Sequence, residues 1–235
     1  MAPNRRNLLK QTTMGSGIIQ TGCGENASVI QNYSEKSKRA KTSARSFKMS
    51  VCAAPKLDKV RIGFVGMGNR GPGAVERMSH IEGVEIAALC DQYEDRVEKI
   101  QQKLEKAGIP RAKTYTGTKD AWKAMCENPD IDLIYITTPW AWHTPMAVYA
   151  MENGKHAASE VPAAKTIDEC WQLVETSEKT RKHCMMLENT CYDFFELLTL
   201  NMARAGFFGE IIHTEGAYIH TLLDSNFSKT NYSEM

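Results

Sequence analysis

A glycine-rich hexapeptide and one carboxylate are the residues with the clearest chemical meaning in this sequence. The segment Gly66-Met67-Gly68-Asn69-Arg70-Gly71 has the spacing G-x-G-x-x-G, follows an apolar stretch and opens a helical one. Such a turn brings a pyrophosphate close to the N–H groups at a helix N-terminus. Asp91 follows about 20 residues later, where a carboxylate accepts hydrogen bonds from ribose hydroxyls and repels a 2′-phosphate. Together these features predict binding of NAD in preference to NADP.

The alternative is an ordinary glycine turn, with Asp91 as a helix cap. The elements around the turn favour the dinucleotide, because short apolar strands alternate with helical stretches from residue 60 onward. We expect strands at 60–65, 84–90, 131–137, 156–159 and 184–187, with a further short one at 112–115. We expect helices at 73–80, 93–107, 119–127, 144–153 and 167–182. This alternation of strands and helices predicts an α/β fold with a Rossmann doubly wound parallel sheet. Ligands bind such a sheet at the carboxyl ends of its strands.

The chain divides into three parts by this pattern. Residues 1–57 are expected to be an export signal and a disordered linker, and residues 58–190 the NAD-binding Rossmann domain. Residues 191–235 offer a helix at 193–205, a turn at Gly206 and Gly209, and a strand at 210–219. We interpret this last part as the start of an incomplete α+β second domain. The sequence therefore predicts a truncated chain or gene fragment.

The N-terminal segment contains a candidate export signal. Residues 4–10 read Asn-Arg-Arg-Asn-Leu-Leu-Lys, which resembles a twin-arginine export signal. The alternative is a disordered basic N-terminus that carries no targeting signal. Lipidation of Cys23 is a further possibility. Residues 24–57 contain little that could bury a core, which is typical of a solvated linker.

Composition excludes several classes of function. The 235 residues are 42% hydrophobic and 24% charged, with a net charge of +1, so nothing steers the protein toward nucleic acid. No apolar run is long enough to span a membrane. The seven cysteines form no C-x-x-C pair, so we expect no zinc or other metal site.

Three later segments narrow the identification: Thr138-Pro139-Trp140-Ala141-Trp142-His143, Gly154-Lys155-His156-Ala157-Ala158-Ser159-Glu160-Val161-Pro162, and Glu188-Asn189. Their order and spacing over roughly 58–220 resemble the Gfo/Idh/MocA oxidoreductases. That family usually carries lysine where Val161 stands, and valine can neither donate nor accept a proton. With Glu215 to His220, these segments look like glycoside hydrolase family 109, the branch of NAD-dependent glycosidases typified by α-N-acetylgalactosaminidase.

The resemblance implies two groups of site residues. The residues expected to contact NAD are Gly66, Gly68, Asn69, Arg70, Gly71, Asp91, Trp140, Ala141, Trp142, His143, Glu160, Val161 and Asn189. Tyr218 is expected to contact the sugar and, with His220 as a base, to take part in catalysis. Each has an alternative: the tryptophans as loop anchors, His143 as a helix cap, Glu160 as a surface acid, and Tyr218 and His220 as one packed face of a strand.

The resemblance also implies a mechanism and a substrate class. Bound NAD would take hydride from the sugar C3, a base would remove the C2 proton, the aglycone would leave, and water and the hydride would then return. The substrate would be a terminal N-acetylgalactosaminide. A redox-neutral enzyme needs a single bound cofactor, which suits export of a folded, loaded protein. A conventional sugar or cyclitol dehydrogenase and a non-catalytic NAD-binding fragment remain the alternatives, and the full-length form could be a homo-oligomer.

Overall fold

Six parallel strands form the centre of the fold in the computed structural model, which describes residues 49–217 and 219. The strands are β1 (Val60–Val65), β2 (Val84–Cys90), β3 (Lys113–Tyr115), β4 (Leu133–Ile136), β5 (His156–Glu160) and β6 (Cys184–Leu187). They lie in the order β3-β2-β1-β4-β5-β6, and every neighbouring pair is parallel. The expected doubly wound sheet is confirmed. From β1 the chain first adds strands on one side (β2, β3) and then on the other (β4, β5, β6), so the strand order reverses between β1 and β4.

The helices are α3 (Gly71–Ser79), α4 (Glu94–Lys106), α5 (Ala121–Glu127), α6 (His143–Glu152), α7 (Ile167–Thr180) and α8 (Phe194–Arg204), with single 3-10 turns η1 (Met49–Val51), η2 (Trp140–Trp142) and η3 (Thr190–Tyr192). Their bounds differ from the expected ones by a few residues. Helix α7 ends two residues early because Arg181 adopts a left-handed φ of 57°, which no helix can continue.

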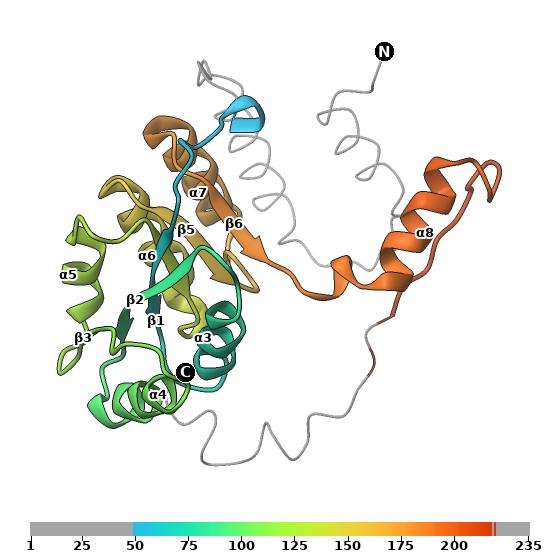
Figure 1. Cartoon of the computed structure of the whole chain (residues 1–235). Helices are drawn as coiled ribbons and strands as arrows, with labels where there is room; N and C mark the ends of the chain where they lie inside the picture. The colour runs from blue at the N-terminus through green and yellow to red at the C-terminus, as the bar shows by residue number, and fades with distance from the viewer. Residues whose placement is uncertain (1–48, 218, 220–235) are drawn as a thin grey trace, which may run out of the picture. The chain divides into compact units, whose positions relative to one another are not determined.

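Helices cover both faces of the sheet and bury two separate apolar clusters (Figure 1). On one face α3 and α4 pack against side chains such as Ile62, Phe64 and Leu89. On the other face α5, α6 and α7 pack against side chains such as Ile134 and Ile136. Burial on both faces explains why these strands read as continuous apolar runs rather than alternating patterns.

A bulge in β2 reverses which face its side chains meet. Ile62 of β1 pairs with Ile86, but the next residue pairs with Ala88, so Ala87 is an extra residue. Ile86 therefore packs on the α3/α4 face, whereas Ala88 and Cys90 pack on the opposite face. A bulge changes the two-residue alternation by one position.

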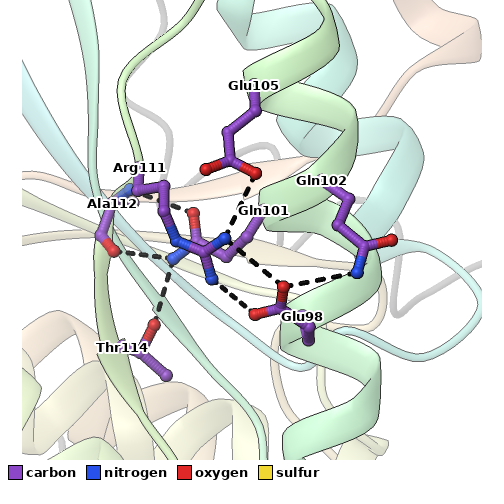
Figure 2. A network of polar contacts seen from close by, with 7 residues as sticks. All are labelled: Glu98, Gln101, Gln102, Glu105, Arg111, Ala112 and Thr114. Atoms are coloured by element: carbon purple, nitrogen blue, oxygen red, sulfur yellow. Dashed lines mark hydrogen bonds and ion pairs between the residues drawn. The ribbon is translucent and has the colours of Figure 1, made fainter.

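A buried glutamine attaches the edge strand β3 to helix α4 (Figure 2). The side chain of Gln101 is fully buried; its Nε2 donates to the Ala112 carbonyl at 2.6 Å and to the Thr114 hydroxyl at 3.0 Å. Its Oε1 accepts from the Ala112 N–H at 3.0 Å. Arg111 lies on the surface beside this contact and pairs with Glu98 and Glu105. As an edge strand, β3 has a neighbouring strand on one side only. The Gln101 side chain supplies hydrogen bonds to Ala112 and Thr114 in and beside β3.

The expected strand at 210–219 is wrong for the residues described there, because 210–217 and 219 form neither helix nor strand. A strand is stable only when its backbone groups pair with a neighbour, and no described strand pairs with this segment. The expected helix before it is present as α8, which buries none of its residues. No helix among 49–217 is both long enough and apolar enough to cross a bilayer.

Candidate functional site

A cleft of about 470 Å³ opens at the carboxyl ends of β1, β2 and β4, where the strand order reverses. Its walls include Gly66 after β1, Asp91 after β2 and Pro139 after β4. Ligands of open α/β sheets bind at this position. Cys90 also lines the cleft, and burial raises the pKa of its thiol to about 12. The thiol is therefore protonated at neutral pH and serves as an apolar wall rather than a nucleophile.

The three glycines of the hexapeptide have different structural roles. Gly66 has a φ of +96°, and a Cβ there would lie 2.8 Å from the Thr137 carbonyl. A Cβ on Gly71 would lie 2.1 Å from the Gly66 oxygen, so only glycine lets helix α3 begin this close to the turn. Gly68 has nothing within 4 Å of its Cβ position. The turn is therefore tightly packed on its protein side and open at Gly68.

Thr137 holds this turn from the neighbouring strand. Its hydroxyl lies within hydrogen-bond distance of the Val65 and Gly66 carbonyls, to which it can donate, and its N–H donates to Val65 at 2.9 Å. Thr137 is buried, so these bonds are shielded from water. The carboxyl end of β4 thereby fixes the start of the glycine turn.

Asp91 holds the same turn from the other side. Its Oδ2 accepts the Met67 N–H at 2.7 Å, and its Oδ1 accepts the Tyr93 N–H at 3.0 Å. The side chain is only 6% exposed. A carboxylate has about four acceptor positions, so one on each oxygen is left for hydroxyls of a ribose. Asp91 can therefore position the turn and bind a sugar diol at the same time.

These residues fit NAD on structural grounds. The N–H groups of the first turn of α3 have no intrahelical partner by helix geometry, and Gly68 leaves room for a pyrophosphate in front of them. The indole Nε1 of Trp122 is buried without a hydrogen-bond partner among the described residues, and Trp122 lines the cleft. A buried donor of this kind suits a nitrogen of a bound base.

An ion pair joins the glycine turn to the end of β5. The Arg70 guanidinium lies 3.5 Å from the Glu160 carboxylate, whose side chain is 11% exposed. Two residues predicted to contact the cofactor are thus brought together from segments far apart in the sequence. Glu160 is not the freely solvated surface acid of the alternative interpretation.

The His143 imidazole connects two loops. It is 1% exposed, and its Nδ1 and Nε2 lie 2.7 Å from the carbonyl oxygens of Pro162 and Thr138, respectively. A carbonyl only accepts, so a neutral ring can donate to one of the two. Trp142 is the N-cap of α6, and both ring nitrogens of His143 face carbonyl oxygens rather than helix N–H groups, so His143 does not cap this helix. Its ring holds the loops after β4 and β5 together.

Most of the remaining predicted residues are not among the residues that line the cleft. Trp142 lines the cleft and meets the Trp122 ring edge-on, with 6.4 Å between centroids. Trp140, Ala141 and Asn189 are exposed and are not among the lining residues. Val161 is half-buried. Tyr218 and His220 lie outside the described residues.

Sequence reasoning missed four residues that shape the site. They are Thr137, Arg96, Lys119 and Trp122. Arg96 lies in the first turn of α4, five positions after Asp91, and that spacing places it beside the strand end it follows. The sequence carries no comparable signal for Lys119 or Trp122, because the chain reaches the cleft again only after β3.

Comparison with known proteins agrees with this geometry. A family profile described as the Gfo/Idh/MocA "Oxidoreductase family, NAD-binding Rossmann fold" matches residues 60–188. Among solved structures, myo-inositol 2-dehydrogenase from Lactobacillus plantarum is similar, with a TM-score of 0.57, 24% identity, and coverage of 66% of this chain and 43% of that one. The WlbA dehydrogenase from Chromobacterium violaceum, solved with NADH and UDP-GlcNAcA, gives 0.55, 22%, 67% and 44%. At these identities the likeness shows the fold.

Curated relatives are much closer in sequence. "Glycosyl hydrolase family 109 protein 1" of Bacteroides fragilis is 64% identical over 170 residues, which are 72% of this chain and 37% of that protein. "Alpha-N-acetylgalactosaminidase" of the same species is 59% identical over 176 residues, 75% of this chain and 41% of that protein. The chain thus spans well under half the length of the relatives it matches.

Proposed function

The chain belongs to the Gfo/Idh/MocA oxidoreductase family, and from this premise we propose that it carries the NAD-binding domain of a glycosidase acting on terminal N-acetylgalactosaminides. The observation that carries the proposal is the 64% identity to a family 109 glycosyl hydrolase over 170 residues. That stretch includes the segments after β4 and β5, because it covers 170 of the 235 residues.

Different residues of this chain would bind different parts of the cofactor. The glycine turn and the α3 N-terminus would bind the pyrophosphate and Asp91 would bind the adenosine ribose, while Trp122 forms part of the cleft wall. NAD, when bound, supplies an acceptor that takes a hydride and later returns it, so no net oxidation results. His143 and the Arg70–Glu160 pair set the positions of the loops around it.

Val161 separates this proposal from a conventional dehydrogenase. Valine has no group that can move a proton, so position 161 cannot assist oxidation at a substrate hydroxyl. We propose instead that His220 serves as the base and that Tyr218 contacts the sugar, as the resemblance implies. We further propose that Trp140, Trp142, Val161 and Asn189 contact NAD, because they follow the strand ends nearest to Glu160.

Binding is tested first, by calorimetric titration of the purified chain with NAD⁺ and NADH. We expect saturable one-site binding, with Asp91→Ala weakening it. Absence of any heat at millimolar nucleotide with folded protein would refute the proposed site.

Activity is tested in a chimera. Residues 60–188 of this chain replace the matching part of the 64% identical Bacteroides fragilis protein, which provides its own remaining residues. We expect release of p-nitrophenol from the p-nitrophenyl α-N-acetylgalactosaminide with no net NADH. Accumulation of NADH with free sugars would instead indicate a dehydrogenase, and a folded chimera that binds NAD without releasing p-nitrophenol would contradict the glycosidase proposal.

Export is a separate proposal. The twin-arginine segment lies outside the described residues, and we propose from its sequence that it directs export. N-terminal sequencing and cell fractionation test this: an exported product lacking the N-terminal residues supports it, and an uncleaved cytoplasmic product contradicts it.

A further inference from the structure

One peptide unit of the glycine turn is hydrogen-bonded at both of its ends. Its carbonyl oxygen, that of Gly66, lies 2.5 Å from the Thr137 hydroxyl. Its N–H, that of Met67, donates to Asp91 Oδ2 at 2.7 Å. Thr137 follows β4 and Asp91 follows β2, and these two strands flank β1 in the sheet. Because a trans peptide unit points its C=O and N–H in opposite directions, a single unit after β1 can join the two side chains.

Hydrogen bonds select the orientation of this peptide unit. Gly66 has a φ of +96°, and a glycine enters this region about as readily as the negative one, so its backbone leaves more than one orientation open. Helix α3 limits the carbonyl oxygen on one side, since a Cβ on Gly71 would lie 2.1 Å from it. Thr137 and Asp91 therefore decide between the remaining orientations.

The Thr137 side chain is suited to hold the carbonyl end. It is buried, and a β-branched side chain has few rotamers, so its hydroxyl has a defined direction. The hydroxyl has one proton to donate and lies near two carbonyl oxygens, those of Val65 at 3.0 Å and Gly66 at 2.5 Å. The Val65 oxygen already accepts the Thr137 N–H, whereas no other donor reaches the Gly66 oxygen among residues 49–217. The hydroxyl proton therefore belongs to Gly66.

The other end of the peptide unit orients the carboxylate of Asp91. This side chain is 6% exposed, and its second oxygen accepts the Tyr93 N–H at 3.0 Å. Consecutive hydrogen bonds shielded from water polarise one another, so the bonds on the two sides of the peptide unit support each other. Without the Thr137 hydroxyl the unit can rotate, and the N–H that fixes Asp91 Oδ2 rotates with it.

We propose that Thr137 is a positioning residue for the adenosine ribose: through the peptide unit between Gly66 and Met67, it orients the Asp91 carboxylate toward the ribose hydroxyls. The inference rests on the proposed cofactor site, in which Asp91 binds this ribose. Thr137 is not among the residues that line the cleft, so it acts through Asp91 rather than by contact with the nucleotide.

The test uses two ligands that differ by one hydroxyl. NAD⁺ and an NAD⁺ analogue lacking the 2′-hydroxyl of the adenosine ribose are titrated into the whole chain by calorimetry. Hydrogen bonds to a charged group are strong, so wild-type protein should bind NAD⁺ about tenfold or more tightly than the analogue. In Thr137→Val this ratio should fall below about threefold, because a carboxylate that has turned away gains little from the hydroxyl.

Two further variants of Thr137 exclude effects of shape. Thr137→Ala removes the hydroxyl without placing a methyl group beside the Gly66 oxygen, and it should lower the ratio as Thr137→Val does. Thr137→Ser restores a hydroxyl and should return the ratio to within about twofold of wild type. Near-ultraviolet circular dichroism establishes that each variant is folded.

Thr144→Val is the matched control. Thr144 is also buried, and its hydroxyl donates to a backbone carbonyl, that of Ala163, at 3.0 Å. It has no bond to the glycine turn, so its loss should leave the ratio unchanged even where stability falls.

A second measurement follows the peptide unit without a nucleotide. Thr137 does not contact the Met67 N–H, but we expect the exchange of this amide, measured by NMR, to be faster in Thr137→Ala than in wild type. In Thr144→Val it should be unchanged. Wild-type exchange of Met67 in folded Thr137→Ala would overturn the inference.

The ratio of the two affinities separates the possible failures. Folded Thr137→Val and Thr137→Ala that keep the wild-type ratio overturn the inference alone, even if both affinities fall, because that result describes a structural role only. Wild-type protein that binds both dinucleotides equally removes Asp91 from ribose binding and overturns the inference with it. Wild-type protein that binds neither shows that the proposed cofactor site, and everything that rests on it, is wrong.

Discussion

The Asp91 carboxylate accepts the backbone N–H of Met67 at 2.7 Å, so a direct hydrogen bond joins the acid after β2 to the turn after β1. The residue predicted to bind a ribose therefore also shapes the loop predicted to bind the pyrophosphate. Ligand binding and local stability are coupled through this one side chain.

Replacing Asp91 should therefore affect stability as well as binding. In Asp91→Asn the amide group must point at the N–H of either Met67 or Tyr93, which places donor against donor. We expect a loss of about 1–3 kcal/mol in the free energy of unfolding and about tenfold or more in NAD affinity. Urea denaturation and calorimetry measure the two effects.

Asp95→Asn is the matched control, since it removes an exposed acid that pairs with Lys99 on the surface and should change stability by less than about 1 kcal/mol. Wild-type stability in Asp91→Asn would contradict the prediction.

Two alanine substitutions in the glycine turn should separate folding from binding. In Gly71→Ala the new Cβ would lie 2.1 Å from the Gly66 oxygen, so the turn must move, at a cost of about 2–4 kcal/mol. In Gly68→Ala nothing lies within 4 Å, so stability should change by less than about 1 kcal/mol. The methyl group there would nevertheless obstruct a pyrophosphate.

Thermal unfolding and NAD titration of both variants check this difference. Equal destabilisation by the two substitutions would show that the turn is not packed as described, and full NAD affinity in Gly68→Ala would place the pyrophosphate elsewhere.

Gln101 should be one of the most sensitive polar residues of the domain. Gln101→Leu leaves the Ala112 N–H and carbonyl without their side-chain partner in a buried place, and we expect a loss of about 2–4 kcal/mol in the free energy of unfolding. Gln102→Leu, one position further on the exposed face, should be nearly neutral (Figure 2). Hydrogen exchange of the β3 amides should increase in Gln101→Leu alone, and unchanged exchange there would contradict the role assigned to this side chain.

Stability should fall on mild acidification because of His156. Burial chiefly, with the charge of Lys182 and the neighbouring His183, lowers the pKa of His156 from its ordinary value of 6.5. The unfolded chain therefore takes up a proton at a higher pH than the folded chain does. The contribution of this group is complete above pH about 6.5 and is lost as pH falls toward the lower folded pKa. Protonation at Nδ1 would also break its bond from the His183 N–H.

The measurement is the free energy of unfolding between pH 7.5 and pH about 5, where one such group contributes a slope of at most about 1.4 kcal/mol per pH unit. His156→Asn keeps an acceptor at the same place without a titrating ring and should flatten the slope. His80→Asn, at the exposed end of α3, should leave the slope as it is; identical slopes in wild type and His156→Asn would refute the assignment.

The parts of this fold that sequence could predict are those set by local pattern. Short apolar runs between helical stretches predicted the strands, and the spacing of Gly66, Gly68 and Gly71 predicted the turn after β1. The strand at 210–219 was wrong because a strand depends on a partner that its own residues do not encode. Trp122 and Lys119 were missed for the same kind of reason, since only the sheet order brings them to the cleft.

The imidazole of His143 has a consequence for how the site responds to a ligand. The buried ring lies 2.7 Å from the carbonyl oxygens of both Thr138 and Pro162, so the segments after β4 and β5 meet at this one side chain. Contact of both segments with a buried side chain fixes part of their arrangement within the folded chain. A ligand that binds between these segments therefore loses less affinity to ordering them than it would with two unconnected loops.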